Sequence, residues 1–221
     1  MLDIPDAAAR SVDAVVFDYG GVLTTALPPV TARWLSADNI DPASFHSTMR
    51  RWLGRDAARD NPVHLLETGR LALSEFEHRL AAALVTLDGA PVRAEGLVDR
   101  LFAGMRHDPV MVDLLRTARA AGLHTALLSN SWGNDYPRAL LDELCDIVVI
   151  SGEIGLRKPD PAIYRHLLNQ LGLPPGRCVF VDDFPVNVRG AEAVGMRAIH
   201  HVNPVTTRTA LHELIVGGAR P

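Results

Sequence analysis

The sequence predicts an α/β fold: a parallel sheet covered by helices on both faces, with a helical segment inserted after the first strand. Two observations indicate this fold. Short runs rich in β-branched residues alternate with segments of helical spacing, and a stretch of about 80 residues after the first run contains no convincing strand. With 221 residues, 48% of them hydrophobic, the chain is long enough for one sizeable core and a smaller second one.

The predicted strands are short and apolar along their whole length, as expected of strands buried on both faces of a parallel sheet. Four runs have this character and a fifth is weaker: Ala14 to Phe17, Thr125 to Leu128, Ile147 to Ile150, Val179 to Val181 and the weaker Met196 to His200.

Segments with helical spacing lie between these runs, and several are followed by a glycine that can end a helix. They are Val110 to Ala121, Pro137 to Leu144, Pro161 to Leu171 and Val186 to Val194. Because ligands bind beyond the carboxyl ends of the strands in such sheets, we expect functional residues directly after the strands.

The stretch from Ala26 to His107 is predicted to be helical, with helices over Leu73 to Leu84 and Glu95 to Phe102. Its length greatly exceeds an ordinary connection between parallel strands. We therefore predict two domains, a sheet domain of residues 1–25 and 108–221 and an inserted helical cap of residues 26–107 that overhangs the site.

Composition excludes several classes of protein. The 22 Lys and Arg against 26 Asp and Glu give a formal charge of −4 without a basic run, so we expect no nucleic acid partner. No stretch approaches the roughly 18 apolar residues of a membrane span, and the first residues lack the bases of a signal peptide. We expect a cytoplasmic protein that does not bind membranes, with Cys145 and Cys178 as reduced core thiols. The sequence carries no signal for the oligomeric state.

Polar residues follow the predicted strands. Asp18 follows the first strand and precedes Gly20 and Gly21, where a bent backbone can approach an anion. The remaining members of this set lie after the later strands: Ser129 and Asn130, Lys158, and the pair Asp182 and Asp183.

Each of these residues could have an ordinary role: Asp18 as a helix cap, Ser129 and Asn130 as a turn, Lys158 as a surface residue, and Asp182 with Asp183 as a capping pair. Their order along one sheet edge favours a common site. Adjacent carboxylates repel each other unless a cation lies near them, and such oxygen ligands suit Mg²⁺. A nucleophilic carboxylate, a hydroxyl, a cation and a metal-binding acid pair are what phosphoryl transfer to a carboxylate requires.

The same segments resemble a known family. Four segments are similar, in order, to the four motifs of the haloacid dehalogenase superfamily: VVFDYGGVL, LLSNSWGND, GLRKPDPAIY and VFVDDFPVNVRGAEAVGM. The closer resemblance is to its phosphatases related to the N-terminal domain of soluble epoxide hydrolase and to sugar-1-phosphate phosphatases. The resemblance implies a Rossmann-like core and a helical cap of the type inserted after the first motif.

The resemblance also implies roles. Asp18 would be phosphorylated and would bind Mg²⁺ together with the carbonyl of Gly20 and Asp183, while Asp182 would act through a bound water. Ser129, the Asn130 backbone, the Gly21 amide and Lys158 would hold the phosphoryl oxygens. The implied activity is Mg²⁺-dependent hydrolysis of a small phosphorylated metabolite.

One position departs from the usual phosphatase pattern, in which a second Asp two residues after the nucleophile is the general acid and base. Here that position is Gly20, whose lack of a carboxyl should cost about 10² to 10⁴ in rate for a poor leaving group. A cap residue, a water or the substrate could supply the proton. Two alternatives stay open: a 2-haloacid dehalogenase, against which Asp182 and Asp183 argue, and a phosphate-binding protein with little turnover.

Two further features are assigned ordinary roles. Asn187 lies one helical turn past Asp183 and is expected to support the acid pair by a hydrogen bond. The group Arg50, Arg51 and Arg55 is expected to form a solvated helix face, although one member could meet an anionic substrate.

Overall fold

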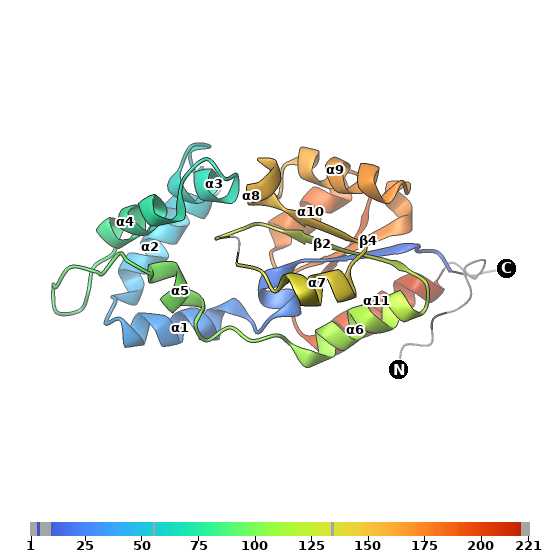
Figure 1. Cartoon of the computed structure of the whole chain (residues 1–221), viewed down its shortest axis with the longest axis horizontal. Helices are drawn as coiled ribbons and strands as arrows, with labels where there is room; N and C mark the ends of the chain where they lie inside the picture. Colours follow the sequence, from blue (N-terminus) through green and yellow to red (C-terminus); the bar gives the residue numbers. More distant parts are fainter. Residues whose placement is uncertain (1–3, 5–9, 55, 134, 218–221) are drawn as a thin grey trace.

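Five parallel strands form one sheet at the centre of the computed structural model, which describes residues 4, 10–54, 56–133 and 135–217 (Figure 1). In spatial order the strands are β3 (Ile147–Ile150), β2 (His124–Ser129), β1 (Ala14–Phe17), β4 (Cys178–Asp182) and β5 (Arg197–His200). Val16 of the central strand β1 is in register with Ala126 on one side and Phe180 on the other. All five predicted strands are confirmed, including the weaker fifth.

Helices cover both faces of the sheet because successive side chains of a strand point to opposite faces. Val15 and Phe17 pack on one side against α6 (Pro109–Ala120), α7 (Arg138–Leu144) and α11 (Pro204–Val216). Ala14 and Val16 pack on the other side against α9 (Pro161–Leu171) and α10 (Pro185–Ala193). The short helix α8 (Ser151–Ile154) follows β3, and a 3-10 turn, η2 (Pro175–Arg177), precedes β4.

Five helices begin in the same way, with an Asp or Asn cap followed by proline. The cap side chain accepts a hydrogen bond from an amide of the first turn, and the proline occupies a position where an amide hydrogen is not needed. The cap residues are Asp41, Asn61, Asp108, Asp160 and Asn203. This local chemistry fixes the helix starts independently of packing.

The segment between β1 and α6 forms a helical cap with a hydrophobic core of its own, which includes the fully buried Phe76, Leu80 and Leu97. Its helices are α1 (Leu27–Ala37), α2 (Pro42–Leu53), α3 (Pro62–Glu67), α4 (Leu73–Ala83) and α5 (Leu97–Phe102). Apart from a bridge where the chain enters and leaves the cap, strand-like pairing in the described part of the cap is limited to one isolated bridge between Ile40 and Thr86. The predicted inserted helical cap is thereby confirmed, and in Figure 1 it lies beside the sheet unit.

The chain enters and leaves the cap at adjacent points. Thr24 forms an isolated bridge with His107, and Thr25 N–H donates to the Arg106 carbonyl at 2.7 Å. These contacts lie next to the predicted boundaries at residues 25 and 108. That the two parts are separate folding units stays a prediction.

Two expectations from composition can be compared with the structure. None of the described helices is long and apolar enough to cross a bilayer. Cys145 and Cys178 are free and buried, as expected.

Candidate functional site

The carboxyl ends of β1, β2 and β4 bring polar side chains together at one edge of the sheet. Asp18 follows β1, Ser129 ends β2 and Asp182 ends β4. Because these strands are parallel neighbours, their ends lie side by side. The Asp18 N–H donates to the Val181 carbonyl at 2.9 Å, which extends the strand pairing by one residue and fixes the Asp18 backbone.

Lys158 lies at the centre of this edge with only 1% of its surface exposed. Its Nζ is 2.8 Å from Asp18 Oδ1 and 2.7 Å from Asp182 Oδ2, and it donates to the Leu128 carbonyl at 2.9 Å. Burial alone would lower the pKa of Lys158, but the charges of the two carboxylates offset this and raise it. The ammonium therefore stays charged at neutral pH.

Asp182 is fully buried, and its carboxylate is occupied by protein donors. It accepts from the Phe184 N–H at 2.8 Å and from Asn187 Nδ2 at 3.0 and 3.1 Å, in addition to Lys158. The predicted hydrogen bond from Asn187 is confirmed. These contacts make Asp182 the group that anchors the Lys158 ammonium beside Asp18.

Asp183 differs from its neighbour because it is only partly buried and less well satisfied. Its Oδ1 is shielded from solvent and has no hydrogen-bond partner among the described residues. Burial, followed by the charge of Asp182, raises the pKa of Asp183 to about 6. Burial also raises the pKa of Asp18, as do the charges of Asp182 and Asp183, although Lys158 opposes this. The site therefore holds more negative charge than Lys158 balances.

The residues present fit a hard divalent cation. Asp18, Asp182 and Asp183 each offer an oxygen, and these oxygens lie within 4.8 Å of one another. A buried carboxylate oxygen without a partner is costly unless a cation or water binds it. Oxygen donors of this kind match the preference of Mg²⁺.

Gly21 has a different role from the one expected. The expectation that its amide holds a phosphoryl oxygen is not supported, because the Gly21 N–H donates to Thr24 Oγ1 at 3.0 Å within the turn η1 (Tyr19–Leu23). Gly21 has φ 77°, and a Cβ there would lie 2.8 Å from Asp183 Cγ. Glycine at this position therefore makes room for the Asp183 carboxylate.

Ser129 and Asn130 lie at the site and make side-chain contacts that the sequence did not indicate. Ser129 Oγ is 2.9 Å from the hydroxyl of Tyr136, whose pKa is raised to about 12 by burial. Asn130 Oδ1 accepts from the Lys158 N–H at 2.8 Å, and Asn130 Nδ2 donates to the Lys158 carbonyl at 3.0 Å. The Asn130 side chain thus fixes the backbone that carries Lys158.

The cap contributes a buried carboxylate, Glu67, that sequence reasoning missed. Glu67 accepts from Arg157 Nε at 2.5 Å, from Trp132 Nε1 at 3.2 Å and from Asn130 Nδ2 at 3.3 Å. Its backbone carbonyl accepts from Ser151 Oγ at 2.5 Å. We call these Glu67 contacts the α3 junction. No local sequence signal could have found it, because its partners lie 63 or more positions away.

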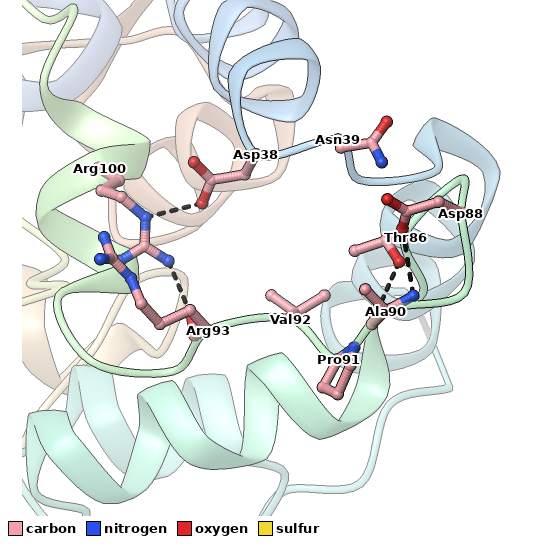
Figure 2. A pocket seen from close by; sticks show the side chains of 9 residues that line it. All are labelled: Asp38, Asn39, Thr86, Asp88, Ala90, Pro91, Val92, Arg93 and Arg100. Atoms are coloured by element: carbon pink, nitrogen blue, oxygen red, sulfur yellow. Dashed lines mark hydrogen bonds and ion pairs between the residues drawn. The ribbon is translucent and has the colours of Figure 1, made fainter.

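A cavity of about 2170 Å³ extends from Asp18, Lys158 and Asp183 into the cap. A second cavity of about 260 Å³ lies within the cap and shares one lining residue, Asn39, with the first (Figure 2). In the smaller cavity Arg100 donates to Asp38 at 2.7 Å and to the Arg93 and Glu95 carbonyls. Because these internal acceptors occupy the guanidinium, we assign Arg100 a structural role in the cap and do not treat the small cavity as a ligand site.

The motif resemblance implies a parallel sheet with a helical insert after its first strand, and a buried lysine among carboxylates at the carboxyl edge of that sheet. The structure has this arrangement. The chain belongs to the haloacid dehalogenase-like hydrolases, and the match to that family covers residues 12–195.

Individual relatives agree with this assignment. Phosphatase MT3486 of Mycobacterium tuberculosis is 32% identical over 197 residues, which are 85% of this chain and 86% of that protein. Acyl-CoA dehydrogenase family member 10 of Mus musculus is 28% identical over 214 residues, 95% of this chain but only 20% of that much longer protein. The structure of a HAD-like family hydrolase from Porphyromonas gingivalis superposes with a TM-score of 0.67 at 25% identity, covering 91% of this chain and 98% of that one.

Proposed function

We propose that this chain is a Mg²⁺-dependent phosphohydrolase that cleaves a small-molecule phosphate monoester through a phosphorylated Asp18. One observation carries the proposal: the buried Lys158 ammonium holds Asp18 Oδ1 at 2.8 Å within a group of three carboxylates. A nucleophilic carboxylate attacking an anionic ester needs this kind of positive charge beside it. The similarity to a mycobacterial phosphatase supports the proposal.

The contacts of Asp18 indicate which of its oxygens attacks. Oδ1 accepts from the Tyr19 N–H at 2.7 Å and is paired with Lys158, which leaves Oδ2 for the phosphorus. In the first step Oδ2 forms a bond to phosphorus while the bond to the ester oxygen breaks, and the departing alkoxide takes a proton. In the second step water attacks the phosphorus, the bond to Asp18 breaks and inorganic phosphate leaves.

Lys158, Ser129 and Asn130 position the phosphoryl group in this proposal. Lys158 supplies charge to Asp18 and to a phosphoryl oxygen, while Asp182 and Asn130 keep its ammonium and backbone in place. The Ser129 hydroxyl, held by Tyr136, orients a second oxygen. Asp18, Asp183 and the Gly20 carbonyl would hold the Mg²⁺ ion, which would neutralise charge on the phosphoryl oxygens. The expected action of Asp182 through a bound water is not supported, because both of its oxygens already accept from Lys158, Asn187 and the Phe184 amide.

The proton donor is the missing part, because Gly20 has no side chain. Its surroundings are open, since a Cβ built there meets nothing within 4 Å. Water can therefore occupy the place of the usual carboxyl, and we expect turnover of poor leaving groups to be slow because water is a weaker acid than a carboxyl group.

We further propose a cytoplasmic location and a small phosphorylated metabolite as the substrate. The two buried thiols without a disulfide support the location.

The proposal is tested by phosphate release from a panel of sugar, nucleotide, alkyl and organic acid phosphates with and without Mg²⁺. Asp18→Asn serves as the control because the amide is nearly isosteric but a far poorer nucleophile and metal ligand. We expect release that requires Mg²⁺, is abolished by a chelator and is absent from a folded Asp18→Asn variant. Halide release from 2-haloacids that survives the chelator would instead establish a dehalogenase, and tight phosphate binding without release would establish a binding protein.

A further inference from the structure

The large cavity is much bigger than a phosphate group requires. Its volume of about 2170 Å³ exceeds the roughly 300–1,000 Å³ of pockets that hold drug-sized ligands. The phosphoryl group needs only the part beside Asp18 and Lys158. The remainder, which the cap helices roof, must accommodate the rest of the substrate.

The two sides of the cavity differ in chemistry. The sheet side presents charged and polar groups, including Asp18, Lys158 and Asp183. The cap side is mostly apolar. Its lining residues include Leu35 of α1, Phe45 and Met49 of α2, Leu101 and Phe102 of α5, and Met105 shortly after α5. One end of the substrate is therefore received by charge and the other by hydrocarbon surface.

The cap side also lacks a cation for a second anionic group. Among the described cap residues that line the cavity, none is Lys or Arg. Arg50 and Arg51 do not line it, and Arg55 lies outside the described residues. On the sheet side Arg157 is paired with Glu67 at 2.5 Å, and Arg189 is exposed on α10. A second phosphate or a carboxylate reaching into the described part of the cap would meet no lysine or arginine there, only the imidazoles of His46 and His64.

Exposed apolar side chains concentrate around this cavity. The described chain exposes eight large hydrophobic side chains, and four of them line the cavity: Leu53 at 41%, Leu87 at 69%, Phe184 at 45% and Val186 at 44%. Leu53 and Leu87 belong to the cap, whereas Phe184 and Val186 lie at the start of α10. Apolar surface gathered around a site in this way commonly marks a ligand that covers it.

We propose that the substrate is the phosphate monoester of an apolar alcohol, with its hydrocarbon body against the cap side and its phosphate at Asp18 and Lys158. This inference rests on the proposed function for the reaction, but it rests on the cavity alone for binding. Each methylene buried against the cap should then improve binding by up to about four-fold.

The experiment is a chain-length series. The rate constant kcat/KM for Mg²⁺-dependent phosphate release is measured for ethyl, butyl, hexyl, octyl and decyl phosphate, with glucose 6-phosphate and phosphoserine as polar comparisons. Binding of the matching alkylphosphonates, which cannot be hydrolysed, is measured by calorimetry. We expect both quantities to rise about two- to four-fold per methylene until the cavity is filled, and octyl phosphate to exceed both polar esters by at least about ten-fold.

Matched variants locate the effect. Leu53→Asn and Phe184→Asn introduce polarity at opposite sides of the cavity and should each reduce the preference for octyl over ethyl phosphate by about three-fold or more. Val205→Asn changes an exposed apolar residue that does not line the cavity, 64% exposed on α11, and should leave the preference unchanged.

Two results overturn the inference. If p-nitrophenyl phosphate is hydrolysed in a manner dependent on Asp18 but kcat/KM is flat with chain length, the reaction stands and the apolar substrate does not. A preference for phosphoserine or glucose 6-phosphate has the same meaning. Phosphonate binding that tightens with chain length while no ester is cleaved would support the apolar pocket and overturn the proposed reaction instead.

Discussion

Gly20 and Gly21 follow Asp18 in one tight turn, yet a side chain would meet different surroundings at each. Gly21 has a positive φ of 77°, and its missing Cβ leaves space that the Asp183 carboxylate occupies. Gly20 has φ −69°, and a Cβ there meets nothing within 4 Å. Only the second glycine is required by the backbone and by a close approach.

Gly21→Ala should therefore displace Asp183 and weaken the proposed metal site. The strain and the steric conflict together cost about 1–3 kcal/mol, so we expect the Mg²⁺ concentration for half-maximal phosphate release to rise by about ten-fold or more. A magnesium titration of activity, with circular dichroism to verify the fold, measures this. Gly20→Ala is the matched substitution and should shift the midpoint far less; equal shifts in both variants would contradict the role given to Gly21.

Gly20→Asp tests the missing proton donor. A carboxylic acid at this position would protonate the departing oxygen, which matters for alkyl phosphates and little for activated aryl phosphates. Because the position is open, we expect kcat/KM for alkyl phosphates to rise by up to about 10² while that for p-nitrophenyl phosphate changes much less. Equal gains on both esters, or losses on both in a folded variant, would mean that the proton comes from another group.

Individual site residues could be predicted where they directly follow a strand. Asp18, Asp182 and Asp183 are brought together because parallel strand ends converge, whereas Lys158 reaches them from the segment between α8 and α9. The sequence could not show that the two adjacent acids have different partners. Asp182 accepts from Lys158, Asn187 and a backbone amide, whereas Asp183 Oδ1 has no hydrogen-bond partner among the described residues. That difference depends on where α10 and the Gly21 turn place their donors.

At the scale of elements, helix α3 connects the cap to the sheet unit through the α3 junction. Burial raises the pKa of Glu67, while the charge of Arg157 opposes the shift. The close approach extends to the backbone, because a side chain at Gly69 would collide with the Gly152 carbonyl. The cap therefore contacts the sheet unit through α3 as well as through the two segments of chain that connect them.

Arg157→Leu should destabilise the protein by about 2 kcal/mol, because it leaves the Glu67 carboxylate buried without its cationic partner. Urea denaturation measures the loss in the free energy of unfolding. The double variant Glu67→Gln with Arg157→Leu removes the unpaired charge and should recover part of that loss. An Arg157→Leu protein as stable as the parent would contradict this account of the α3 junction.

Elements were more predictable than the contacts between them. Five helix starts are set by local Asp-Pro or Asn-Pro pairs, and the strands by short apolar runs, so these features can be inferred from neighbouring residues. The contact of α3 with the loops after β2 and β3 involves residues far apart in sequence, and no periodicity encodes it.

At the scale of the whole molecule, we predict that the cap moves and that ligand binding restrains it. Opening of the cap to admit the substrate would require the α3 junction to break. Closure would restore the junction and exclude water from the site. Hydrogen exchange measured with Mg²⁺ and an alkylphosphonate should slow in α3 and in the loops around Asp18 and Asp183. Slowing confined to the loops of the sheet unit would indicate a static cap.

The overall architecture followed from the sequence because α/β alternation and a long strand-free insert have few structural solutions. The shape and chemistry of the large cavity did not, since its walls come from α1, α2, α5 and α10 together. Apolar residues that line a cavity and those that fill a core look the same in a sequence.

The position of β1 at the middle of the sheet also affects how the chain folds. β1 ends at Phe17, but its two neighbours begin only at His124 and Cys178, so neither partner exists when the strand leaves the ribosome. The helices of the cap, whose contacts are closer in sequence, can form in the meantime. The order of synthesis thus favours folding of the cap first, while the central strand β1 stays unpaired until β2 and β4 have been synthesised. Slow pairing of this kind exposes an apolar segment to aggregation and lengthens folding.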